Sequence, residues 1–454
     1  MKKETLSNPE KIKVEPATTR TDTPQTEVGS VFVSNYPPYS FWSEDNITEV
    51  QQTLQQTFSN QTNLGLYLHI PFCRKRCKFC YFRVYTDKNS QEIERYLDLL
   101  SKEVELYADM PAIAERNLHF IYFGGGTPSF ISSKFLKNLV ARVKAAMPWD
   151  KALEVAFECE PGTLTQSKLE TIREVGVTRL SIGVENLNDS VLRENGRAHV
   201  TKEIYRIMPW VHQLEFDQVN IDLIAGMVGE VRQTWEDTVQ KAIDLDPDSI
   251  TIYQMELPFN TVYSKQILDE DGTNLYVADW QTKREWHQYA IEQLIDAGFE
   301  VSSAYTMVKK DRPNQFIYRD ALWHSSDMIG AGVASFSHLN GIHFQNQTHW
   351  KGYLDSLEAG RLPLNRAFKI STEEKMTREM ILQLKLGQIE VDYFREKFGV
   401  DILEKFAQPY RKLQKEGLLY FNEDNVTLTL QGLLRIDQLL PEVYAEKYQN
   451  ARYT

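Results

Sequence analysis

Residues 65–80 read GLYLHIPFCRKRCKFC, an apolar strand-like run followed at once by three cysteines in a C-x₃-C-x₂-C spacing. Three thiolates in one short loop can ligate three irons of a four-iron cluster and leave the fourth iron open to an exogenous ligand. The alternative is a zinc site formed by Cys73, Cys77, Cys80 and His69. Zinc sites usually pair two cysteine-containing units from separate segments, and this sequence has no second unit. The spacing therefore favours an iron–sulfur cluster.

Strands and helices alternate along the chain from this stretch onward. Short apolar runs predict six strands, at residues 66–70, 118–123, 153–157, 178–182, 219–224 and 249–253. Helical patterns fall between them at 91–109, 132–146, 165–175, 201–213 and 231–244, and a helix at 276–297 and a strand at 299–305 follow. Apolar strands separated by helices indicate a parallel sheet covered on both faces. We therefore predict an α/β fold of a curved or barrel-like kind, with functional residues just beyond the C-terminal strand ends.

Composition divides the chain into five parts. Residues 1–30 are rich in Thr, Glu, Pro and Lys and predict a disordered tail. Residues 31–64 hold an aromatic patch and predict a lead-in that packs on the main domain. The main domain spans 65–305, and an extension of it covers 306–370. Residues 371–454 predict a separate module, in which three helical patterns precede a β-hairpin as in a winged helix.

Charge and composition limit the partners of the chain. Its 454 residues carry 51 Lys and Arg against 63 Asp and Glu, a formal charge of −12, and only four cysteines. This balance argues against a nucleic-acid-binding surface, and so few cysteines exclude a disulfide-stapled scaffold. The N-terminal lysines are not followed by the apolar run of a secretory signal, and no stretch of about 18 apolar residues occurs. We expect a cytoplasmic protein without a nucleic-acid or membrane partner, and leave its oligomeric state open.

Polar residues stand where several of the predicted strands end. Gly124, Gly125 and Gly126 follow the second strand, where glycines allow positive φ and close approach of backbone N–H groups to a ligand, although a tight strand–helix turn uses them equally well. Glu158 ends the third strand, where its carboxylate can accept hydrogen bonds from a ligand amine or ribose. Asp222 is a charge inside an apolar strand and needs either a ligand or an internal ion pair.

The cysteine loop, with its flanking motif Tyr67-x-His69-Ile70-Pro71-Phe72-Cys73, resembles that of radical S-adenosylmethionine (SAM) enzymes. Within them it is similar to the oxygen-independent coproporphyrinogen III oxidase family, over about residues 65–440. The resemblance implies a partial (β/α)₆ barrel and a [4Fe-4S] cluster on Cys73, Cys77 and Cys80. It also implies that SAM binds the open iron. An electron from an external flavodoxin- or ferredoxin-like reductant then cleaves SAM to a 5′-deoxyadenosyl radical, which abstracts hydrogen from a small-molecule substrate.

The same resemblance implies a set of SAM contacts. Arg197 pairs with the SAM carboxylate, a task that suits a planar guanidinium because it meets a carboxylate through two parallel bonds. The full set of implied contacts is Tyr67, Phe79, Gly124, Gly125, Glu158, Glu185, Arg197 and Asp222.

Two departures from the family pattern bear on the reaction. Coproporphyrinogen oxidases carry a further cysteine where this chain has Phe82. They also carry an Asn-Arg-Glu-Gln motif where residues 196–199 of this chain read Gly-Arg-Ala-His. Both departures resemble haem chaperones, haem-degrading methyltransferases and class C methylases, the last of which hold two SAM molecules. We therefore expect one-carbon transfer to an unsaturated or aromatic substrate, with porphyrinogen decarboxylation and haem delivery as the alternatives. For haem delivery, the candidate iron ligands are His338, His343 and His349.

Overall fold

A computed structural model describes residues 32–58, 62–258, 261–269, 276–312, 315–449 and 451. The tail predicted for residues 1–30 lies outside the described residues. Within the described part, no helix is long and apolar enough to cross a membrane.

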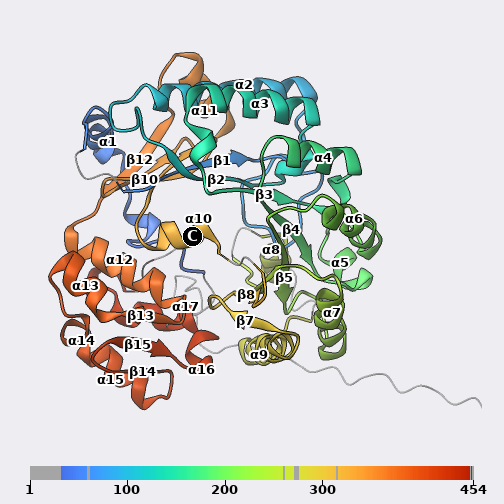
Figure 1. Ribbon diagram of the computed structural model, residues 1–454, viewed down its shortest axis with the longest axis vertical. Helices are drawn as coiled ribbons and strands as arrows, with labels where there is room; N and C mark the ends of the chain where they lie inside the picture. The colour runs from blue at the N-terminus through green and yellow to red at the C-terminus, as the bar shows by residue number, and fades with distance from the viewer. Residues whose placement is uncertain are drawn as a thin grey trace, which may run out of the picture.

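Six parallel strands in sequence order form the centre of one curved sheet (Figure 1). They are β1 Leu64–Ile70, β2 Leu118–Gly125, β3 Glu154–Cys159, β4 Arg179–Glu185, β5 Gln218–Ala225 and β6 Ser249–Gln254. Helices on the outside of the sheet connect them: α2 Ser90–Ala108, α3 Ser133–Ala146, α4 Gln166–Glu174, α5 Asp189–Glu194, α6 Thr201–Gln213 and α7 Arg232–Asp244. The predicted α/β fold, a partial (β/α)₆ barrel, is confirmed.

The alternation of side chains along β1 shows why this sequence forms the central strand. Leu66, Leu68 and Ile70 are completely buried in the core beneath the outer helices. Tyr67 and His69 point to the other face, because successive side chains of a strand alternate between the two faces of a sheet. The cysteine loop therefore leaves the sheet at the C-terminal end of a strand that is anchored in the apolar core.

The sheet continues on both sides of the six strands. Beyond β6, two short antiparallel strands, β8 Thr306–Lys309 and β7 Phe299–Val301, take the place of the single strand predicted at 299–305. Before β1, strand β9 Asp327–Ala331 pairs parallel with it, followed by antiparallel β10 Phe336–Leu339, β11 Ile342–Asn346 and β12 Leu364–Lys369. The helices of this part are α8 Val262–Asp269, α9 Trp280–Asp296, α10 Ile317–Trp323 and α11 Trp350–Glu358.

The C-terminal region is a winged-helix-like unit on the opposite side of the molecule from α4, α6 and α7 (Figure 1). Its helices before the hairpin are α12 Thr372–Leu384, α13 Val391–Phe398, α14 Ile402–Lys405 and α15 Ala407–Lys415, four where three helical patterns were predicted. A three-stranded antiparallel sheet joins β13 Gln388–Glu390, β15 Asn425–Leu428 and β14 Leu419–Phe421, and the short helices α16 Leu430–Leu433 and α17 Ile436–Leu439 follow.

The lead-in joins the two parts of the molecule. Val33 and Tyr36 belong to the apolar core of the C-terminal unit. Trp42 instead stacks on His343 of β11, with ring centroids 5.4 Å apart, and helix α1 (Ile47–Leu54) packs against β11 and β12. The lead-in was predicted to pack on the main domain, and it packs on the C-terminal unit as well.

Candidate active site

The cysteine loop is closed at its base by backbone hydrogen bonds. Cys73 N donates to Tyr85 O at 3.1 Å, and Tyr85 N donates to Pro71 O at 2.8 Å. Cys73, Cys77 and Cys80 are half-buried free thiols, whereas Cys159 is a buried thiol in the apolar core. The three thiols thus belong to a loop whose base is fixed at the end of β1.

Two of these thiols accept hydrogen bonds from neighbouring side chains. Thr127 Oγ1 donates to Cys73 Sγ at 3.3 Å, and Arg197 Nη1 donates to Cys77 Sγ at 3.4 Å. Burial raises the pKa of Cys73 to about 11 and that of Cys80 to about 12, with the neighbouring Cys77 acting in the same direction. A bound metal favours the thiolate and reverses this preference.

His69, the fourth ligand of the zinc alternative, has other neighbours. Its Nδ1 lies 3.2 Å from the Tyr67 hydroxyl, and a side chain at Gly125 would meet its ring at 2.5 Å. Among the residues that the structure describes, no three His, Cys, Asp or Glu side chains are grouped as ligands of a single metal ion. His69 therefore packs behind the glycine turn and not beside the cysteines.

The glycine turn after β2 connects the cysteine loop to β3. Gly125 has a φ of 112°, and its N donates to Glu158 Oε2 at 3.1 Å. Gly126 N donates to Ile70 O, and Thr127 N donates to Phe72 O, each at 2.8 Å. The turn thus ties β1 to β2 and places the Gly125 backbone at the wall of a cavity.

Three half-buried carboxyl groups stand near the ends of β3, β4 and β5. Tyr122 OH donates to Glu158 Oε1 at 2.8 Å, and burial raises the pKa of Glu158 to about 7. Burial also raises the pKa of Glu185 to about 7, although Arg197 opposes the shift. Asp222 accepts hydrogen bonds from Ser181 at 3.0 Å and Asn220 at 2.9 Å, the partners that its position inside a strand requires.

Arg197 crosses between the carboxyl groups and the cysteine loop. Besides its bond to Cys77, its Nη2 donates to Gly183 O at 2.6 Å and lies 3.4 Å from Glu185 Oε1. Only 10% of the side chain is exposed. The guanidinium is thus fixed between one cysteine sulfur and the end of β4.

These groups face one cavity of about 450 Å³. It is lined by nine of the eleven residues that the sequence nominated: Cys73, Cys77, Phe79, Cys80, Gly125, Glu158, Glu185, Arg197 and Asp222. Tyr67 and Gly124 lie behind the wall, where Tyr67 stacks on the lining residue Tyr122 with centroids 5.9 Å apart.

Other residues of the wall were not nominated from the sequence. Tyr122 and Tyr253 lie on β2 and β6, near the strand ends where functional residues were expected. Phe32 of the lead-in and Asp437 of α17 also line the cavity, and no local pattern marks them. Sequence reasoning missed them because their position depends on how the two outer parts fold back onto the barrel.

The candidate haem ligands do not meet at this cavity. His338 and His343 are buried cross-strand partners on β10 and β11, with ring centroids 4.6 Å apart. His349 precedes α11, and its Nδ1 lies 3.1 Å from Arg83 Nη1. None of the three lines the cavity, whose wall includes His287 instead.

Comparisons with known proteins agree with this geometry. The family model of the radical SAM superfamily matches residues 67–242, and that of the HemN C-terminal domain matches 370–435. The heme chaperone HemW of Bacillus subtilis is 27% identical over 373 residues, covering 81% of this chain and 96% of that protein. The oxygen-independent coproporphyrinogen III oxidase of a Synechocystis species is 25% identical over 423 residues, covering 89% and 90%.

A solved structure shows the same fold. Coproporphyrinogen III oxidase (HemN) of Escherichia coli superposes with a TM-score of 0.78 at 23% identity, covering 91% of this chain and 96% of that one. These relatives are named as oxidases and a haem chaperone, so they give no support to the expected one-carbon transfer. Members of the superfamily use a [4Fe-4S] cluster and SAM. The chain thus carries the domains of the radical SAM superfamily and of the HemN C-terminal family, as its resemblance to the oxygen-independent coproporphyrinogen III oxidase family implied.

Proposed function

We propose that this protein binds a [4Fe-4S] cluster through Cys73, Cys77 and Cys80 and uses SAM to abstract hydrogen from a tetrapyrrole. One observation carries the proposal: the three thiols share a single cavity with Arg197 and the carboxyl groups near three neighbouring strand ends. The donor set fits the cluster, because the thiols are free and half-buried and two accept hydrogen bonds, as thiolates do.

When bound, the cluster supplies the electron that cleaves SAM to methionine and a 5′-deoxyadenosyl radical. The residues of the chain bind the SAM molecule and orient it. Arg197 is placed to pair with a ligand carboxylate, and its bond to Gly183 O fixes the direction of the guanidinium. Glu158 and Asp222 offer acceptors to an ammonium or ribose hydroxyl, and the bonds from Tyr122 and Ser181 hold their orientation.

The far side of the cavity suits a flat aromatic substrate. Phe32, Tyr253 and Tyr305 come together there from the lead-in, β6 and the turn before β8, with Phe32 and Tyr305 centroids 5.1 Å apart. Haem is a flat aromatic macrocycle, and the separate pyrrole rings of a porphyrinogen are flat and aromatic as well, so both can stack on aromatic side chains. The names of the two relatives, a coproporphyrinogen oxidase and a haem chaperone, support the same class of substrate.

The first test is anaerobic product analysis. Protein reconstituted with iron and sulfide and reduced with dithionite should release 5′-deoxyadenosine from SAM. Cys77→Ala should release none, whereas Cys159→Ala, which removes the one cysteine outside the loop, should retain cluster and activity. Equal release by the wild type and Cys77→Ala would refute the cluster assignment.

The product then identifies the reaction. Added coproporphyrinogen III should release CO₂ if the chain shares the reaction for which its oxidase relatives are named. S-adenosylhomocysteine would instead show one-carbon transfer. The similarity to HemW favours haem binding as a second candidate function, and a tight Soret shift on haem titration without substrate turnover would show it.

A further inference from the structure

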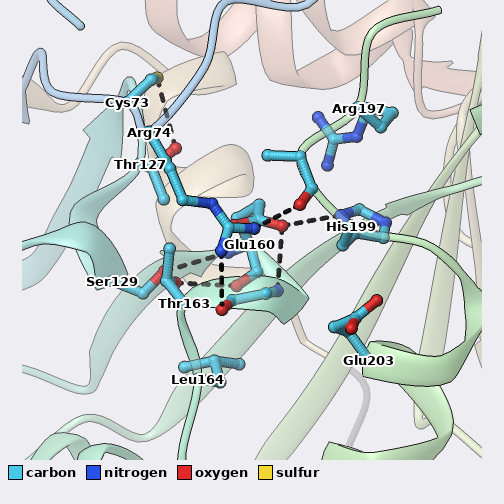
Figure 2. Close-up of polar contacts among 12 residues, drawn as sticks. Cys73, Arg74, Thr127, Ser129, Glu160, Thr163, Leu164, Arg197, His199 and Glu203 are labelled. Carbon is cyan, nitrogen blue, oxygen red and sulfur yellow. Dashed lines mark hydrogen bonds and ion pairs between the residues drawn. The ribbon is translucent and has the colours of Figure 1, made fainter. Parts of the chain in front are cut away.

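Glu160 connects the cysteine loop to the segment that carries Arg197. Figure 2 shows it between Arg74, the residue after Cys73, and His199. Its Oε1 accepts hydrogen bonds from His199 Nδ1 at 2.9 Å and from Gly162 N at 2.9 Å. Its Oε2 lies 3.6 Å from Arg74 Nη2. Glu160 as a whole is 7% exposed, so it lies inside the protein beside the loop.

Arg74 is fixed from several directions, although 45% of its side chain is exposed. Its guanidinium donates to Ala198 O and, at 3.4 Å, to Gly162 O. A side chain at position 162 would meet Arg74 Nη2 at 2.2 Å, so the glycine there leaves the room that the guanidinium occupies. A freely solvated loop cation would need neither these acceptors nor this space.

The same segment of chain holds the loop at a second point. Lys78 N donates to Asn195 O at 3.1 Å, and Lys78 Nζ pairs with Glu194 at 3.0 Å. The loop is therefore clamped on both sides of Cys77, by Arg74 near Ala198 and by Lys78 near Glu194. Of the two clamps, only the one at Arg74 has a buried carboxyl group behind it.

We propose that Arg74, Glu160 and His199 form a positioning unit that fixes the cysteine loop and balances charge beside the cluster. The unit rests on the proposed function, which places the cluster on this loop. One-electron reduction makes a cluster more negative, so a nearby cation favours the reduced form and a nearby carboxylate opposes it. The negative charge of Glu160 offsets the effect of the positive charge of Arg74 on the cluster. His199 holds the Glu160 carboxylate in its place beside Arg74.

The experiment is a potentiometric titration of the reconstituted cluster, followed by electron paramagnetic resonance. Glu160→Gln should raise the ratio of reduced to oxidised cluster at the wild-type midpoint at least about threefold, roughly 28 mV for a one-electron couple at 59 mV per tenfold change. Arg74→Gln should lower this ratio by a similar factor. The double variant should return close to the wild type, because the two charges are lost together.

A matched control and a second variant keep the test decisive. Glu203→Gln removes a carboxylate that lies nearby in Figure 2 but contacts neither Arg74 nor Glu160, and it should leave the midpoint unchanged. Arg74→Gln changes a half-exposed side chain, so it still reports if Glu160→Gln unfolds. Unchanged midpoints in Arg74→Gln and Glu160→Gln, or shifts in the same direction, would overturn the proposal. A wild type that assembles no cluster would overturn the proposed function instead.

Discussion

Glu103, a fully buried residue of α2, couples the stability of the protein to pH. Its carboxyl group accepts hydrogen bonds from Tyr353 OH at 2.6 Å, Gly332 N at 2.8 Å and Asn346 Nδ2 at 2.6 Å. Burial nevertheless raises its pKa to about 8, so the group is largely protonated in the folded protein at neutral pH. The contact with Gly332 matters to the site, because Gly332 packs against His69 at the end of β1.

The size of the effect follows from linkage. Below its usual pKa of 4.5, Glu103 is protonated in both the folded and the unfolded protein, and its contribution to stability is fully present. As the pH rises toward 8, the unfolded chain loses this proton while the folded protein keeps it, so the free energy of unfolding falls. The difference between 4.5 and about 8 corresponds to roughly 5 kcal/mol, at about 1.36 kcal/mol per pH unit.

Glu103→Gln removes this dependence, because an amide does not titrate. Guanidinium unfolding of the cluster-free variant and wild type, followed by circular dichroism at pH 5, 6, 7 and 8, measures the difference in their free energies of unfolding. As the pH rises, the variant should become more stable relative to the wild type by about 1.4 kcal/mol per pH unit. Glu105→Gln, which removes a half-exposed carboxylate from the same helix, should change stability by no more than about 0.5 kcal/mol. Parallel curves for Glu103→Gln and wild type would refute the neutral, buried state of Glu103.

Three further changes test other parts of the structure. Arg197→Lys loses the planar guanidinium that reaches both Cys77 and Gly183, so the affinity for SAM should fall at least about tenfold while the iron content is unchanged. Anaerobic equilibrium dialysis measures this affinity, and an unchanged value contradicts the SAM assignment. Gly125→Ala places Cβ 2.5 Å from the His69 ring at a φ of 112°, and should lower the free energy of unfolding by about 1–3 kcal/mol more than Gly399→Ala, a positive-φ site with open space. Asp437→Asn leaves the fully buried Lys385 without its carboxylate, and chemical unfolding should show a loss of about 3–5 kcal/mol; a loss below about 1 kcal/mol would mean that water reaches the lysine.

The sequence predicts the central sheet well because each of its strands is buried on both faces and reads as an apolar run. The predicted strand ends are less accurate where polar residues continue the strand. β3 runs to Cys159 and β4 to Glu185, past the predicted ends at 157 and 182, because the backbone goes on pairing after the side chains turn polar. Glu158 and Glu185 are therefore part of their strands.

The polar connections of the site are harder to predict, because their partners are distant in sequence. Glu158 lies within β3 and faces Tyr122, whereas Glu160 lies beyond the end of the strand and faces His199. Neither Arg74 nor His199 is near Glu160 in the chain, so no sequence pattern connects the three residues. The loop cations Arg74 and Lys78 likewise bind partners in the barrel that are more than 100 residues away in the chain.

The cavity explains why the motifs identify the family but not the reaction. Its cysteine side is built from the loop after β1, the ends of β2 to β5 and the α5–α6 connection that carries Arg197, and these segments carry the cysteine, glycine and SAM-contact motifs recognised in the sequence. Its other side is built by Phe32, Tyr305 and Asp437, where Tyr305 OH donates to Asp437 at 2.5 Å and Phe32 packs on the Tyr305 ring. A substrate that reaches this side contacts the lead-in and the C-terminal unit, which the radical chemistry does not constrain. The choice of substrate therefore rests with contacts that only the folded chain brings together.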